Sequence, residues 1–159
     1  MRFKPVPEPR SRSDLATIQA AVPLVPGSTE DCCARIVART TVPSRDEART
    51  WLTFLRALDL VDATETGYVR TDRDPHDDAV ASAFRANVYG ACEVCDTVDA
   101  AEGPMTAAAV ADAVDIVPRW ERHRSPDAER DWRTRITALL EWATVFDLLT
   151  STASGYRPA

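Results

Sequence analysis

The chain has 159 residues, of which 45% are apolar and 28% are charged. This composition is typical of a folded globular protein and excludes disorder over the whole chain. No stretch approaches the roughly 18 consecutive apolar residues that a membrane span requires, and the first ten residues lack the apolar core of a signal peptide. We therefore expect a cytoplasmic protein without a membrane partner.

The charge is unevenly distributed. Lys4 is the only lysine, so nearly all positive charge is carried by arginine, and the net charge is −6. An acidic composition of this kind resembles that of proteins from extreme halophiles, and a genome rich in G and C is the alternative explanation of the arginines. Residues 72–103 carry about −6 and residues 1–28 about +2, while residues 29–71 and 104–159 carry about −1 each. A local basic face therefore remains available in either half.

The first half of the chain predicts a tail followed by three helices. Residues 1–12 contain three prolines, so we expect a mobile tail that forms neither a helix nor a paired strand. Helices are predicted from residue 13 to 22, from Ser28 to Thr41, and from Ser44 to Asp59. The last of these has a capping box, formed by Ser44 and Glu47, and an apolar stripe with helical spacing.

A hairpin and a long helix are predicted next. Residues 60–63 and 68–71 read as two strands around a turn that contains Gly67. Asp74 and Pro75 then favour the start of a helix, and apolar residues recur with helical spacing to about residue 101. We expect this helix of residues 75–101 to connect two units and to offer a homodimer surface.

The second half repeats this order. A helix over residues 105–116 and a basic segment over residues 118–124 precede a helix that begins at Ser125 and Pro126. Residues 145–150 and 156–158 again predict a hairpin, with its last strand shortened by Pro158.

The two halves also align with each other. The apolar positions of Trp51–Asp62 match those of Ile136–Asp147 at a constant shift. Each run then reaches Gly-Tyr, at Gly67 and Gly155, after three extra residues in the second copy. One pattern that holds twice is stronger than a single motif, although short amphipathic helices also align by chance.

The segment Ser28–Thr71, in particular LRALDLVDATETGYVRT, resembles the winged helix-turn-helix fold of archaeal and bacterial transcription regulators. The resemblance covers residues 14–71 well and residues 76–158 less well, and with the charge composition it indicates a haloarchaeal protein. It implies a mainly α fold with small β-hairpins, in which two winged-helix-like units, residues 13–72 and 73–159, are joined by the long helix. It also implies a third helix available for the major groove and a wing for the DNA backbone.

Candidate DNA-binding residues follow from the helical period. On the third helix, Arg45, Arg49 and Arg56 fall within about 40° of one another, with Thr53 nearby and the apolar stripe opposite. The alternative is an ordinary solvated face whose arginines pair with neighbouring carboxylates. The wing contributes Arg70, but Glu65 at its tip would repel phosphate.

The second unit offers a different basic group, which precedes its long helix. This group is formed by Arg119, Arg122 and Arg124 beside Trp120. Arginine and an exposed ring together would bind phosphate and stack. The alternative, which we favour, is that Trp120 plugs the core and the arginines pair with acidic neighbours.

Motifs of catalysis are absent from the sequence. It has no glycine-rich phosphate loop, no metal-binding His motif and no nucleophile elbow, so we expect no enzyme activity and no cofactor. Four cysteines, Cys32, Cys33, Cys92 and Cys95, are interpreted as buried thiols rather than metal ligands, with zinc binding and redox sensing as the alternatives.

Two functional hypotheses remain. The first is a DNA-binding transcription regulator that places the third helix of the first unit in the major groove. The alternative is a protein-interaction adaptor whose winged-helix units do not bind DNA, for which the acidic net charge is suited.

Overall fold

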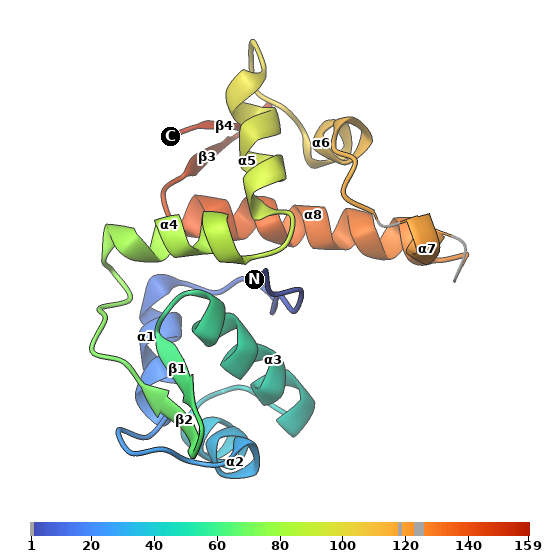
Figure 1. Ribbon diagram of the computed structural model, residues 1–159. Coiled ribbons are helices and arrows are strands. Elements are labelled where there is room, and N and C mark those ends of the chain that lie inside the picture. The colour runs from blue at the N-terminus through green and yellow to red at the C-terminus, as the bar shows by residue number, and fades with distance from the viewer. Residues whose placement is uncertain (1, 118, 123–125) are drawn as a thin grey trace. The chain divides into compact units, whose positions relative to one another are not determined.

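The computed structural model describes residues 2–117, 119–122 and 126–159, and the chain divides into two units, Met1–Val88 and Tyr89–Ala159 (Figure 1). The boundary lies later than the one expected after residue 72. The reason is that the helix following residue 72 belongs to the first unit, where the Asn87 side-chain amide donates to the Ala57 carbonyl at 2.9 Å.

Unit 1 has three helices, a hairpin and a fourth helix. Its elements are α1 (Arg12–Ala21), α2 (Thr29–Arg39), α3 (Arg45–Ala57), β1 (Val61–Thr64), β2 (Gly67–Arg70) and α4 (Asp78–Asn87). The first three helices begin after serines, Ser11, Ser28 and Ser44, each of which accepts from the backbone N–H three residues on. Helix α3 packs against α2 and β1, and the apolar stripe expected on it is buried at Trp51 and Leu55.

Unit 2 repeats the order of three helices and a hairpin, with one short helix added before the third helix and, among the described residues, no helix after the hairpin. Its elements are α5 (Ala91–Ala100), α6 (Ala107–Ala113), α7 (Arg119–Arg122), α8 (Ala128–Val145), β3 (Leu149–Thr152) and β4 (Gly155–Pro158). The mainly helical fold with two antiparallel hairpins is therefore confirmed. Pro158 pairs with Leu149 at the end of the hairpin, so the last strand is as long as its counterpart in unit 1 rather than shortened.

The single helix expected over residues 75–101 is wrong, because the structure has two helices there. Helix α4 ends at Asn87, and Val88 is extended with φ −92° and ψ 125°. Gly90 then adopts a left-handed conformation with φ 89°, and a side chain at this position would crowd Ile116. The apolar repeat continues through this break, which is why the sequence pattern did not show it.

Residues 2–11 pack on unit 1 in this structure, and Arg12 begins α1, contrary to the mobile tail expected over residues 1–12. The Phe3 N–H donates to the Asn87 carbonyl at 2.6 Å, which forms a parallel bridge between Phe3 and Val88. The Arg10 guanidinium donates to the Thr41 hydroxyl at 2.6 Å, and Pro7 is buried. Prolines exclude regular structure, but they do not prevent packing.

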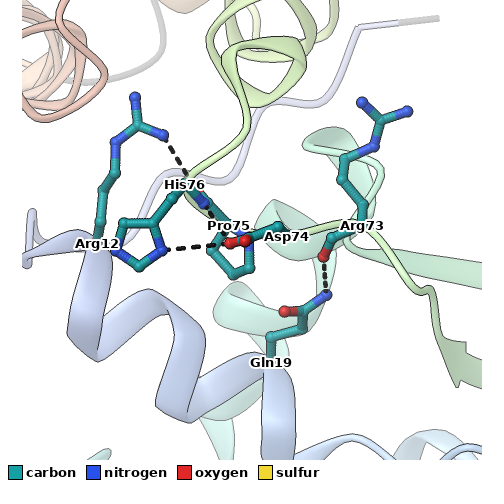
Figure 2. A network of polar contacts seen from close by, with 6 residues as sticks. All are labelled: Arg12, Gln19, Arg73, Asp74, Pro75 and His76. Atoms are coloured by element: carbon teal, nitrogen blue, oxygen red, sulfur yellow. Dashed lines mark hydrogen bonds and ion pairs between the residues drawn. The ribbon is translucent and has the colours of Figure 1, made fainter.

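The segment that follows the first hairpin is fastened to α1 by side-chain hydrogen bonds (Figure 2). The buried Gln19 amide donates to the Leu60 carbonyl at 3.2 Å and to the Arg73 carbonyl at 3.1 Å. Arg12 donates to the Pro75 carbonyl at 2.9 Å. The Asp74 carboxylate accepts the His76 N–H at 2.9 Å, which holds the pKa of Asp74 below its ordinary value.

From the third helix to the end of the hairpin, the structural repeat has a constant offset of 88 residues, whereas the first two helices repeat at 78 to 79 because unit 2 has an insertion that contains α7. Asp59 and Asp147, 88 positions apart, both have φ of 60° directly after their helices. The backbone N–H of Leu60 donates to the Leu55 carbonyl at 2.9 Å. In the second copy, the backbone N–H of Leu148 donates to the Ala143 carbonyl at the same distance. The alignment of Trp51 with Ile136, which used an offset of 85, is therefore wrong by three residues, close to one helical turn. At the offset of 88, Phe54 corresponds to Trp142.

Each hairpin is held against the segment between the first two helices of its unit. Tyr68 exchanges two backbone hydrogen bonds with Gly27, at 2.8 and 2.9 Å, and Tyr156 exchanges two with Met105, at 2.7 and 2.9 Å. The backbones approach so closely that a side chain at Gly67, where φ is 140°, would overlap the Gly27 carbonyl. Only glycine fits this position.

Replacing Gly67 by Ala should destabilise unit 1 by about 3 kcal/mol, because the change adds both backbone strain and overlap. Chemical denaturation followed by circular dichroism measures this. The matched control is Gly103→Ala, since no atom lies within 4 Å of a side chain at that site. The interpretation fails if the two variants unfold at the same denaturant concentration.

Candidate nucleic-acid interface

The outer face of α3 presents two exposed arginines near the beginning of the helix. The Ser44 hydroxyl accepts the Glu47 N–H at 3.2 Å and fixes where the helix starts. Arg45 and Arg49 follow on the first and second turns, with 67% and 58% of their side chains exposed. The helical period thus places both guanidinium groups on the side away from the buried Trp51 and Leu55.

A carboxylate from the neighbouring helix lies between these arginines. Glu30, in the first turn of α2, lies 3.3 Å from the Arg45 guanidinium and 3.5 Å from that of Arg49. All three side chains are more than half exposed, so each ion pair contributes little to stability. The expected partners were acidic neighbours on α3 itself, and the spacing along one helix gave no sign of Glu30.

The other residues predicted for this face are less accessible. Thr53 is half-buried, and its hydroxyl donates to the Arg49 carbonyl at 3.2 Å. Arg56 is half-buried, with its guanidinium 5.2 Å from the centre of the Phe3 ring. Arg70 lies on β2 opposite Val61, and its Nε is buried with no hydrogen-bond partner among the described residues. The structure therefore brings Arg45 and Arg49 together, and Arg70 lies on the wing strand β2, the element from which it was expected to act.

Unit 2 does not have a comparable face. At the offset of 88, the counterparts of Arg45, Arg49, Thr53 and Arg56 are Arg133, Thr137, Glu141 and Thr144. Arg133 is paired with Asp112 at 2.9 Å, and Glu141 is exposed at the position of Thr53. Unit 2 therefore has one arginine where unit 1 has three, and a carboxylate where unit 1 has a threonine.

A family model described as the halobacterial double winged helix domain matches residues 1–159 of this chain. The chain belongs to this family. The tandem winged-helix resemblance inferred from the sequence is therefore confirmed over the whole chain, together with the halobacterial association. The same comparisons find no match among curated proteins and none among solved structures.

The basic segment of this double winged helix protein contains a short helix. Arg119 and Arg122 are the first and last residues of α7, and the structure does not describe their side chains. Arg124 lies outside the described residues. Trp120 is 60% exposed, so the expectation that it plugs the core is wrong. Glu121 accepts the Trp132 indole N–H at 2.7 Å and ties α7 to α8.

Arg135 is a charged residue of the second winged helix that sequence reasoning missed. It donates to the Tyr89 carbonyl at 2.7 Å, and its guanidinium lies 5.9 Å from the Tyr89 ring centre and 5.5 Å from that of Trp132. Burial lowers the pKa of Arg135 to about 10. The aromatic spacing in the sequence gave no sign of this cluster, which holds the start of α5 against α8.

Three of the four cysteines of the double winged helix chain are buried, namely Cys32, Cys33 and Cys95, whereas Cys92 is half-exposed. Burial raises the pKa of both Cys32 and Cys33, so little thiolate is present at neutral pH. Within the described residues, no cluster of histidine, cysteine or acidic side chains is arranged to hold a metal ion. In the same part of the chain, no helix has the length and apolarity to cross a membrane.

We expect a thiol reagent such as dithionitrobenzoate to modify Cys92 first in the native protein. Cys32 and Cys33 should react slowly, and raising the pH toward their elevated pKa values should speed them by increasing the thiolate fraction. Absorbance at the nitrothiobenzoate band gives the stoichiometry, and Cys92→Ser should remove the fast phase. A fast phase that survives this substitution would contradict the assignment.

Proposed function

We propose that this protein is a cytoplasmic DNA-binding transcription regulator that inserts the beginning of α3 into the major groove. The observation that carries the proposal is the pair of exposed arginines, Arg45 and Arg49, on the outer face of the third helix of a winged helix unit. In helix-turn-helix proteins, residues in the N-terminal part of the recognition helix contact the base edges. Arginine is also the side chain best suited to guanine and to phosphate.

Glu30 competes with DNA for the same two guanidinium groups. A phosphate or a guanine edge that binds Arg45 and Arg49 replaces contacts at 3.3 and 3.5 Å to an exposed carboxylate. Because exposed ion pairs are worth about 0–1 kcal/mol, the competition lowers affinity without preventing binding. Removing the negative charge should therefore strengthen binding.

Only unit 1 is proposed to read DNA through its third helix. The second unit has Thr137 and Glu141 where the first has Arg49 and Thr53. An exposed carboxylate at the centre of this face would repel phosphate. Phosphate contacts from Arg119, Arg122 and Arg124, and from Arg70 on the wing, remain predictions, as does a homodimer through residues 75–101.

The second candidate function is a protein-interaction adaptor. It is favoured by the net charge of −6, by exposed Glu65 in the wing turn and by exposed Glu141 in unit 2. These charges would repel DNA, yet they do not oppose binding to another protein. The two functions differ in whether duplex DNA is retained at all.

Arg45→Ala combined with Arg49→Ala should weaken binding to duplex DNA and reduce its salt dependence. Each phosphate contact that is lost lowers the slope of log affinity against log salt by about 0.9, so the slope falls by about 1.8 at most, and by less where an arginine contacts a base instead. Gel shift and fluorescence anisotropy over a KCl series, with fragments recovered by genomic pull-down, measure both effects. The matched control is Arg39→Ala combined with Arg157→Ala, which removes two exposed arginines from other elements.

Glu30→Gln provides the opposite change on the same face. We expect DNA affinity to rise by about two- to fivefold, because the competing carboxylate is lost while the fold is retained. If the double arginine variant binds as tightly as the control variant, the assignment of α3 is wrong. If the wild-type protein retains no DNA, the adaptor function replaces the regulator.

A further inference from the structure

The N-terminal segment runs alongside α3 and is anchored to it at two places. At the first, the Arg10 guanidinium lies 5.7 Å from the centre of the Trp51 ring and donates to Thr41. At this anchor the segment and α3 share a hollow of about 300 Å³, which is lined by Val6, Pro7, Glu8 and Arg10 from the segment and by Glu47, Thr50 and Trp51 from α3. The segment thus follows the flank of α3 adjacent to its exposed face.

The second anchor is at the end of α3. The Phe3 ring lies beneath the Arg56 guanidinium, 5.2 Å away, and the Phe3 N–H donates to the Asn87 carbonyl at 2.6 Å. Asn87 in turn donates from its side chain to the Ala57 carbonyl at 2.9 Å. Phe3 is therefore fixed to the last turn of α3 by its ring and through a chain of two hydrogen bonds.

This anchoring places two further cations beside the end of α3. Arg2 and Lys4 flank Phe3 in an extended stretch and are exposed, whereas Phe3 itself is half-buried. Successive side chains of an extended chain point to opposite sides, so Arg2 and Lys4 lie on the outer side when Phe3 faces Arg56. Positive charge thus continues past the C-terminal end of the helix.

The length of α3 indicates what these cations would meet. A helix of 13 residues is about 20 Å long, whereas the major groove is about 12 Å wide. If Arg45 and Arg49 at the start of the helix reach the bases, the other end therefore lies at the phosphate backbone. Cations at that end meet phosphate rather than base edges.

We propose that residues Arg2–Arg10 form a fixed phosphate-binding element, in which Arg2 and Lys4 contact the DNA backbone and Phe3 is the positioning residue that holds them beside α3. This inference rests on the proposed function, since it assumes that α3 enters the major groove. A flexible arm loses backbone conformational entropy when it binds DNA, which lowers its affinity, whereas a segment that is already fixed does not have this cost. Loss of Phe3 therefore weakens binding although no charge is removed.

The test uses the full chain and a fluorescein-labelled mixed-sequence DNA duplex. Binding is measured by fluorescence anisotropy over a series of KCl concentrations at which circular dichroism shows that every variant is folded. Arg2→Ala combined with Lys4→Ala should lower the salt slope by about 1.8 relative to wild type. Phe3→Ala should weaken binding by about three- to tenfold with both cations retained, and Phe3→Tyr should restore it. Hydrogen exchange should show a protected Phe3 amide in the wild-type protein without DNA.

The outcomes separate this proposal from the one on which it rests. If Arg45→Ala with Arg49→Ala weakens binding but Arg2→Ala with Lys4→Ala does not, the phosphate-binding element is wrong and the function of α3 stands. If Phe3→Ala binds as the wild type does, or if the amide of residue 3 exchanges freely, the segment is not fixed and the proposal fails. If neither arginine-containing pair affects binding, both proposals fail together.

Discussion

The architecture of each unit depends on a pair of backbone hydrogen bonds between its hairpin and the segment that joins its first two helices. A two-stranded hairpin alone is marginally stable in water, because it buries too little apolar surface unless it packs against further strands or helices. Gly27 supplies a third chain segment to Tyr68 in unit 1, and Met105 supplies one to Tyr156 in unit 2. The contact fixes the wing with respect to the helices that follow. Since β1 packs on α3, it also fixes the face that α3 presents.

How much of this fold the sequence predicts depends on the kind of pattern involved. Capped helices and Gly-containing turns are local, and both helix-helix-helix-hairpin units could be predicted from them. The register of the repeat could not, because a shift of three residues nearly completes a helical turn and leaves the apolar stripe in phase. Asp59 and Asp147, with φ of 60° in each copy, settle the offset at 88, and that backbone conformation has no reliable sequence signature.

Two other expectations were wrong for related reasons. An apolar repeat continued through residues 88–90, so it predicted one helix where Gly90 separates two. Three prolines exclude a helix before Arg12, where α1 begins, but the ring of Phe3 and the guanidinium of Arg10 still pack on unit 1. In both cases the deciding contacts are made with residues distant in the chain. Glu30 was missed in the same way, since the period of α3 cannot show a carboxylate that α2 contributes.

The acidic net charge has less influence on DNA binding than its value suggests. In concentrated salt, for which an acidic halobacterial surface is suited, the Debye length falls to about 3 Å at 1 M. Carboxylates in residues 72–103 are then screened from phosphates bound at α3, whereas Glu30 acts directly because it lies within 4 Å of both arginines. Salt screens the long-range attraction between the protein's cations and the DNA phosphates to the same extent. Binding under such conditions therefore depends on cations that the fold already holds at the DNA-contacting surface. This favours cations held by the fold, such as Arg45 and Arg49, over a flexible basic arm.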